Sequence, residues 1–470
     1  MKRRDFFKNG SLFAFGGLVS DFHSNLWLDN KDEFGSKKAK NIIFMVSDGM
    51  STGTLNMADR LLYLKNGKGS HWLELYREGK INRALMDTAS ADSMVTDSAA
   101  ASSSWGGGKR VPNGALNVSA SGEEHLPIWQ KFKQSGKKVG CVTTVPITHA
   151  TPAGFCVMQK DRGDQDQIAL DYLDIEFDVM MGGGNENFAA DKRGDGRDLY
   201  SAFESKNYKV FKSRGELMNY RGKQPMLGVF SDDGLPYALD RAHDSDLSQN
   251  TPSLAEMSKK AIDYLSTNSD DGFVLQIEGG KVDWAAHAND ASALLYDQIA
   301  FDEAIKEVID FAESDQETLV IITTDHGNAN PGLIKSHEVD ENFNHLSHFT
   351  HTNAWLLNKI KTEANSFASI RELIADVNGN QTITKDQAKT LMNYYTKSNK
   401  GLYNTNNLPF GPLAEMQKDY TSIGWISMNH SGDYVELAAY GPGSDQLNPF
   451  VKNYELHNFM LKVAEVENKF

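Results

Sequence analysis

Three aspartates and three histidines of this chain are candidate metal ligands, namely Asp48, Asp283, His287, Asp325, His326 and His430. Asp283 and His287 are four residues apart, which places both side chains on one face of a helix as a chelating pair. Carboxylate and imidazole groups suit Zn²⁺, and two such ions about 4 Å apart can hold the attacking and leaving oxygens of a phosphoryl transfer. The pattern therefore predicts two zinc sites that serve phosphoryl chemistry.

Ser98 is the candidate nucleophile. It precedes an alanine run, so we expect it at the N-terminus of a helix, where free amides and the helix dipole favour an anion. The alternative interpretation is an ordinary N-cap serine. No histidine has a spacing from which a catalytic triad with Ser98 follows, so activation of the hydroxyl by a metal ion is the better route.

The elements that must position these residues follow from the hydrophobic pattern. The predicted buried strands are residues 42–46, 139–145, 179–181, 273–277, 319–322 and 434–440. Amphipathic helices are predicted over 251–265, with Thr251 as N-cap and Pro252 at the first helical position, and over 291–312. Such alternation predicts an α/β fold with a doubly wound, mainly parallel central sheet flanked by helices.

Polar residues stand where three of these strands end: Ser47 and Asp48 after the first, Glu278 after another, and Asp325 with His326 after a third. In open α/β sheets, ligands bind beyond the carboxyl ends of the strands. We therefore expect these three groups, which are far apart in the sequence, to converge on one edge of the sheet.

Residues 331–424 break the alternation and are rich in Asn, His and Lys. We interpret them as an inserted crown or lid over the active-site edge, within a single catalytic domain of residues 36–470. Residues 376–387 resemble a calcium loop, but Thr384 and Gln387 also form an ordinary helix capping box, which is the preferred interpretation.

Residues 1–35 are expected to form an export signal and linker. Arg3 and Arg4 belong to a twin-arginine pattern, and the weakly apolar stretch that follows is shorter than the roughly 20 residues of a membrane span. This predicts a periplasmic or secreted protein without a stable membrane span. The alternative is a basic tail on a cytosolic enzyme.

Charge and cysteine content exclude several classes of function. A formal net charge of -15 argues against a nucleic-acid binder and against adsorption on anionic membranes. It does not exclude an anionic substrate, because a bound metal ion can dominate the local charge of a site. Cys141, in a predicted strand, and Cys156, in a predicted helix, are too few for a thiolate zinc site and are expected to be buried free thiols.

Several motifs resemble those of the alkaline phosphatase family. Ser98 lies in Asp-Ser-Ala-Ala, which resembles the family's nucleophile motif, and Thr151-Pro-Ala with Arg162 eleven residues later matches its magnesium and substrate-arginine region. The remaining matches are Glu278 with Asp283 and His287 at the family's spacing, Asp325 with His326, and His430 followed by Ala438–Pro442. The resemblance runs from about residue 40 to 330 and again from 425 to the end.

The resemblance implies a role for each residue. The implied ligands of the first zinc ion are Asp283, His287 and His430. Those of the second are Asp48, Asp325 and His326, with Ser98 when it is deprotonated. The implied magnesium ligands are Asp48, Thr151 and Glu278. Arg162 would grip two phosphate oxygens through its planar guanidinium. The implied reaction is the hydrolysis of varied phosphate monoesters through a phosphoserine, in a homodimer.

Two positions depart from the enterobacterial pattern of the family. His149 stands in place of an aspartate and Trp284 in place of a lysine, as in some other bacterial members that this chain resembles. Both residues are expected at the substrate site. Loss of the aspartate at position 149 should weaken the magnesium site, and loss of the lysine at position 284 should remove one phosphate contact. The alternatives are a phosphodiesterase or sulfatase with the same two-metal core, a non-catalytic metal- or phosphate-binding envelope protein and, for the assembly, a monomer.

Overall fold

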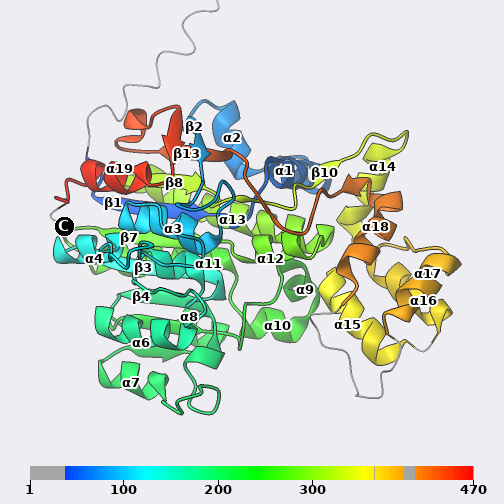
Figure 1. The fold of residues 1–470 in the computed structure, drawn as a ribbon, viewed down its shortest axis with the longest axis horizontal. Helices are drawn as coiled ribbons and strands as arrows, with labels where there is room; N and C mark the ends of the chain where they lie inside the picture. Colours follow the sequence, from blue (N-terminus) through cyan, green and yellow to red (C-terminus); the bar gives the residue numbers. More distant parts are fainter. Residues whose placement is uncertain (1–37, 365, 396–407, 469–470) are drawn as a thin grey trace, which may run out of the picture.

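The computed structural model describes residues 38–364, 366–395 and 408–468, so the predicted export signal lies outside the described residues. A ten-stranded sheet runs through the protein (Figure 1). Its strands, in spatial order, are β14 (Phe450–Lys452), β2 (Asn82–Asp87), β13 (Val435–Tyr440), β8 (Thr318–Thr323), β1 (Asn41–Val46), β7 (Phe273–Glu278), β3 (Lys138–Pro146), β4 (Val179–Gly183), β6 (Met226–Val229) and β5 (Lys209–Phe211). Neighbours are parallel except where β13 pairs with β2 and β8. The predicted mainly parallel α/β sheet is confirmed.

The central strands are buried on both faces, which explains their unbroken apolar sequence. In β1, Ile42 and Phe44 pack in the core on one side of the sheet, whereas Ile43 and Met45 pack in the core on the other. Successive side chains of a strand point to opposite faces, so a strand between two helical layers needs apolar residues at every position.

Helices cover both faces of the sheet. One core includes side chains from α3 (Ser98–Gly107), α4 (Ile128–Gln134), α5 (Ala150–Gly154), α6 (Gln165–Ile175), α7 (Leu199–Ser205) and α19 (Glu455–Val463). The other includes side chains from α1 (Thr52–Asn66), α2 (His71–Arg77), α8 (Arg214–Asn219), α11 (Leu254–Thr267), α12 (Lys281–His287) and α13 (Ala291–Asp315). None of the helices in the described part of the chain has the length and apolar composition needed to span a bilayer.

Two local predictions were wrong in detail. The helix α11 begins at Leu254 and not at Pro252, because Ser253 and Glu256 form a reciprocal capping box that outcompetes Thr251 as the N-cap. Cys156 lies just beyond α5 instead of within a helix. It and Cys141 are buried and unpaired, as expected.

The segment interpreted as an insertion packs in a third, smaller core that it shares with helices of the main body. Two short strands, β10 (Gly332–Leu333) and β11 (Ile423–Gly424), pair and bring its ends together. Between them lie α14 (Val339–Asn344), α15 (Asn353–Glu363), α16 (Phe367–Val377), α17 (Lys385–Asn393) and α18 (Phe410–Thr421) (Figure 1). Their apolar side chains pack with residues of α1, α13 and α9 (Ala238–His243). The capping box of Thr384 and Gln387 is confirmed at the start of α17.

Candidate active site

The three polar groups at strand ends meet at one edge of the sheet. β1 lies between β7 and β8 and is parallel to both, so the carboxyl ends of the three strands are adjacent. Asp48, Glu278, Asp325 and His326 are each fully buried there. The convergence expected from the strand pattern is therefore present in the structure.

Ser98 is the first residue of α3, but it does not cap that helix. The cap is Asp97, whose carboxylate accepts a hydrogen bond from the amide of Ala100 at 2.9 Å. The Ser98 hydroxyl is thereby released from capping, and its Oγ lies 3.3 Å from Nε2 of His326. The side chain is only 1% exposed, so the hydroxyl is aimed into the site and not into solvent. This arrangement favours the nucleophile interpretation over the ordinary N-cap.

Asp283, His287 and His430 form one potential metal-binding group. The Oδ2 and Oδ1 atoms of Asp283 lie 3.4 Å and 3.6 Å from Nε2 of His287 and of His430. Nδ1 of His287 contacts the carbonyl of Met428 at 2.8 Å, and Nδ1 of His430 contacts that of Thr96 at 3.0 Å. Since a neutral imidazole carries one proton, both Nε2 atoms present lone pairs to the site.

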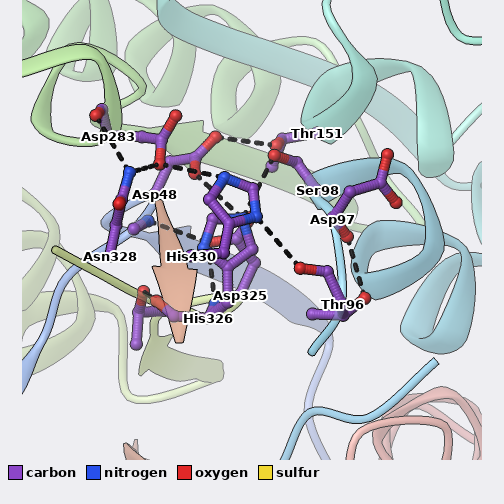
Figure 2. A network of polar contacts seen from close by, with 12 residues as sticks. Asp48, Thr96, Asp97, Ser98, Thr151, Asp283, Asp325, His326, Asn328 and His430 are labelled. Atoms are coloured by element: carbon purple, nitrogen blue, oxygen red, sulfur yellow. Dashed lines mark hydrogen bonds and ion pairs between the residues drawn. The ribbon is translucent and has the colours of Figure 1, made fainter. Parts of the chain in front are cut away.

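Asp48, Asp325 and His326 form a second group. Nε2 of His326 lies 3.1 Å from Oδ2 of Asp325 and 3.7 Å from Oδ1 of Asp48. The imidazoles of His326 and His430 are stacked with centroids 3.7 Å apart, so the two groups are neighbours (Figure 2). Burial raises the pKa of Asp325 to about 6, and burial together with Asp325 raises that of Asp48. Such carboxylates need a positive partner to remain ionised.

A third group contains Asp48, His149 and Glu278. Thr151 joins it, because its hydroxyl donates to Oδ2 of Asp48 at 3.2 Å. Glu278 accepts a hydrogen bond from the hydroxyl of Thr143, and burial raises the pKa of Glu278 to about 7. The expected magnesium residues are thus together, with the imidazole of His149 added to them.

Arg162 lies beside these groups and is held on both sides of its guanidinium. Nη1 donates to Oδ2 of Asp97 at 3.0 Å, and Nη2 contacts Nε2 of His149 at 3.0 Å. The side chain is 27% exposed, so part of it faces the solvent side of the site. Trp284 adds an aromatic wall, with its ring centroid 6.2 Å from that of His149. This geometry suits the binding of a tetrahedral oxyanion next to Ser98.

The sequence matches the model of one protein family, described as alkaline phosphatase, over residues 39–466. The chain belongs to the alkaline phosphatase family. The match continues through residues 331–424, whereas the motif resemblance was interrupted there. This alkaline phosphatase hydrolyses phosphate monoesters, and the family membership favours that activity over the phosphodiesterase, sulfatase and non-catalytic alternatives.

Individual relatives agree with the family match. Alkaline phosphatase 3 of Bacillus subtilis is 29% identical over 98% of this chain and 96% of its own length. The repressible alkaline phosphatase of Saccharomyces cerevisiae is 30% identical over 86% of this chain and 76% of its own length. Among solved structures, the alkaline phosphatase of Thermus thermophilus superposes with a TM-score of 0.84 at 29% identity, covering 96% of both chains.

Sequence reasoning missed two side chains of the site. Asp97 holds Arg162 and caps α3, and Asn328 donates from Nδ2 to Oδ1 of Asp283 at 2.7 Å (Figure 2). Asp97 directly precedes Ser98, the candidate nucleophile, so its position was a usable signal. Asn328 lies two residues after His326. A single asparagine in such a place is more often a turn residue, so the sequence carried no specific signal of its role at the site.

Proposed function

We propose that this alkaline phosphatase cleaves phosphate monoesters through a covalent phosphoserine on Ser98, with two zinc ions and one magnesium ion in the three ligand groups. The observation that carries the proposal is the Ser98 hydroxyl. It is buried, free of capping, located at a helix N-terminus and 3.3 Å from His326 of the second group. A serine in that position can be activated by a bound cation without a histidine base.

The residues present fit divalent cations. Buried polar atoms without a hydrogen-bond partner cluster in the second and third groups: Oδ1 of Asp48, Oε1 of Glu278, Oδ2 of Asp325, and Nδ1 of His326 and His149. Orphaned buried carboxylate oxygens carry a large desolvation cost unless a cation offsets it. The concentration of such atoms at one edge of the sheet supports ion binding there.

The ligand types support zinc in the first two groups. The proposed first zinc ligands are Asp283, His287 and His430, and the proposed second zinc ligands are Asp48, Asp325 and His326. Mixed imidazole and carboxylate sets are typical of zinc. When bound, the zinc ions would lower the pKa of the serine hydroxyl and stabilise the charge of the leaving oxygen.

Magnesium is proposed for the oxygen ligands Asp48, Thr151 and Glu278. Thr151 supplies a neutral hydroxyl, and the two carboxylates supply the charge that a hard cation requires. His149 brings a nitrogen donor to the same group, which magnesium accepts poorly. We therefore expect a weaker magnesium site than three carboxylates and a hydroxyl would make.

The geometry supports the following steps by the chain itself. The Ser98 oxygen attacks phosphorus and forms a P–O bond, while the bond from phosphorus to the ester oxygen breaks and the alcohol leaves with a proton. A water molecule then attacks the phosphoserine, releasing inorganic phosphate and restoring the hydroxyl. Arg162 binds two nonbridging oxygens in both steps, oriented by Asp97 and His149.

Cellular context and assembly are further parts of the proposal. The twin-arginine pattern at Arg3 and Arg4 supports export to the periplasm or the medium. Family resemblance supports a homodimer, and small-molecule phosphate monoesters are the proposed substrates. Residues 331–424 are proposed to be an insertion within one catalytic domain of residues 36–470, because its helices share a core with α1 and α13.

The test is hydrolysis of p-nitrophenyl phosphate by the metal-loaded enzyme and by Ser98→Ala, with mass spectrometry of acid-quenched reactions. The wild type should carry one phosphate on Ser98, and the variant should lose hydrolysis while retaining its metal content. Bis(p-nitrophenyl) phosphate and p-nitrophenyl sulfate should react far more slowly. A Ser98→Ala enzyme with wild-type turnover would overturn the covalent route, and faster diester turnover would overturn the role of Arg162.

A further inference from the structure

A buried lysine lies behind the wall of the active site. Lys281, the first residue of α12, is 7% exposed, and its Nζ lies 3.9 Å from the ring centroid of Tyr237 and 4.4 Å from that of Trp284. An ammonium group at these distances is attracted to the face of an aromatic ring, most strongly when it is shielded from water. Lys281 thus holds the rings of Tyr237 and Trp284 together.

The surroundings of Lys281 keep its side chain in place. Its backbone amide donates to Oγ1 of Thr144 at 3.0 Å. Burial lowers the pKa of the ammonium to about 8, and the carboxylates of Asp297, Asp233 and Asp240 act in the opposite direction. These three carboxylates favour the charged form of the side chain.

A chain of contacts leads from this lysine to the phosphate-binding arginine. The ring of Trp284 meets that of His149 edge to face, at an interplanar angle of 75°. Nε2 of His149 contacts Nη2 of Arg162 at 3.0 Å. Asp97 holds the other arm of the guanidinium, so His149 decides how the Nη2 side is oriented.

Close packing prevents Trp284 from moving away from His149. A Cβ atom built on Gly234 would lie 2.8 Å from Cζ3 of Trp284 and 3.3 Å from Cδ of Lys281. There is therefore no room for a side chain between Gly234 and the indole, which also contacts the lysine and the ring of His149. A ring confined on three sides transmits a displacement to its neighbours.

We propose that Lys281 is a positioning residue for phosphate binding: its ammonium fixes the Trp284 ring, which fixes His149 and through it the orientation of the Arg162 guanidinium. The inference rests on the role of Arg162 in the proposed function. The proposed role of Lys281 bears on position 284, where this chain has tryptophan in place of the lysine of the enterobacterial pattern. The cation that the enterobacterial pattern places at that position is replaced here by an aromatic ring with a cation behind it.

The test compares Lys281→Met and Lys281→Arg in the metal-loaded enzyme at pH 7, using the inhibition constant of inorganic phosphate with KM and kcat for p-nitrophenyl phosphate. Loss of the cation–π contact should raise the phosphate inhibition constant and KM about three- to tenfold in Lys281→Met. Lys281→Arg should recover most of the loss, because a guanidinium also stacks on aromatic rings. kcat should change much less than KM.

Two further variants separate positioning from a general loss of structure. Gly234→Ala keeps the lysine, and its new Cβ crowds the indole at 2.8 Å more closely than the lysine Cδ at 3.3 Å, so it should raise the phosphate inhibition constant in the same direction. The matched control is Lys137→Met, which removes another buried lysine whose ammonium donates to the carbonyls of Lys40 and Asp271 at the opposite end of β3. It should lower the melting temperature and leave KM unchanged.

A double-mutant cycle with Arg162→Ala tests whether Lys281 affects phosphate binding through Arg162. If Lys281 acts through Arg162, Lys281→Met should cause no further weakening of phosphate binding in the Arg162→Ala background. The inference is overturned if folded Lys281→Met and Gly234→Ala both keep the wild-type phosphate inhibition constant, or if the increase persists without Arg162. Failure of the phosphoserine route would appear separately, as a wild-type enzyme that turns over without labelled Ser98.

Discussion

The Nε2 atoms of His287 and His430 lie 3.0 Å apart, although in each imidazole Nδ1 is the atom that contacts a backbone carbonyl. Two nitrogen lone pairs at this distance repel each other unless a proton or a cation lies between them. The carboxylate of Asp283 is 3.4 Å and 3.6 Å from the same two atoms. The backbone carbonyls of Met428 and Thr96 thus orient both rings as the proposed first zinc site requires.

Removal of the metal ions is expected to destabilise the folded protein as well as to stop hydrolysis. An ion present at about one hundred times its Kd stabilises the protein that binds it by about 3 kcal/mol. Chelation should therefore lower the melting temperature, and added zinc should restore both the melting temperature and the hydrolytic activity. His430→Ala should bind one zinc equivalent fewer, whereas His337→Ala, at an exposed histidine, should bind the normal amount. Equal melting temperatures before and after chelation would contradict this prediction.

Asn328 is expected to orient Asp283 for metal binding. Its Nδ2 donates to Oδ1 of Asp283 at 2.7 Å, in addition to a longer contact with the backbone carbonyl of Asp283 at 3.3 Å. Loss of such an orienting partner typically costs about 10- to 100-fold in metal affinity or activity. Asn328→Ala should therefore need more zinc for half-maximal activity, as measured by zinc titration of the apoenzyme.

The control for Asn328 is a buried asparagine remote from the ligands. Asn353 exchanges two amide hydrogen bonds with Gln417 inside residues 331–424. Asn353→Ala should reduce stability but leave the zinc titration unchanged. If the two variants shift the titration equally, Asn328 has no specific role at Asp283.

Asp290 is expected to anchor the helices of residues 331–424 to α13. Its buried carboxylate accepts hydrogen bonds from the amide of Ala293 at the start of α13 and from the amides of Asn353 and Ala354 at the start of α15. Asp290→Ala leaves these donors unsatisfied, so we expect a loss of about 2–4 kcal/mol in the free energy of unfolding. Urea denaturation measures the change.

An exposed aspartate within α13 provides the comparison for Asp290. Asp310 is exposed and forms an ion pair with Lys306 one turn earlier. Exposed pairs of this kind contribute about 0.3–0.5 kcal/mol. Asp310→Ala should accordingly be close to neutral. An Asp290→Ala protein as stable as Asp310→Ala would show that the α13–α15 contact carries no stability.

The parts of the site that sequence analysis predicted are those set by strand periodicity. Apolar runs defined the strands that end before Asp48, at Glu278 and before Asp325, and parallel pairing of adjacent strands required their ends to meet. Capping was not predictable in the same way. Asp97 and Ser98 are both good caps, and Asp97 is selected by tertiary contacts of its carboxylate with Gly114 and Arg162.

The contacts of residues 331–424 could not be predicted because they depend on long-range packing. The core that they form combines Met57 and Leu61 of α1 with Leu295 of α13, Leu356 of α15 and Leu413 of α18. Each of these helices has an apolar face, but no local pattern states which faces meet. Helix existence follows from periodicity, whereas the pairing of helices follows from shape and loop length.

His457 is expected to make the stability of the protein depend on pH between about 4 and 6.5. Its Nδ1 contacts the carbonyl of Trp105 at 3.0 Å and therefore carries the proton of the neutral imidazole. Nε2 keeps its lone pair and accepts a hydrogen bond from Nζ of Lys131 at 3.0 Å. Burial, followed by the charge of Lys131, lowers the pKa of His457 from 6.5 to about 4. Because the folded-state pKa is the lower one, the unfolded chain binds a proton first as the pH falls.

The contribution of His457 to stability is therefore complete above pH 6.5 and is lost progressively toward pH 4. A shift of this size corresponds to roughly 3 kcal/mol. His457→Gln keeps a donor and an acceptor but does not titrate, so the advantage of the wild type over the variant should shrink as the pH is lowered from 7 to 4. Urea denaturation of both proteins at several pH values measures this difference, in which the titration of the metal ligands cancels because both proteins share it. A difference that stays constant across this range would mean that Lys131 and burial do not hold His457 neutral.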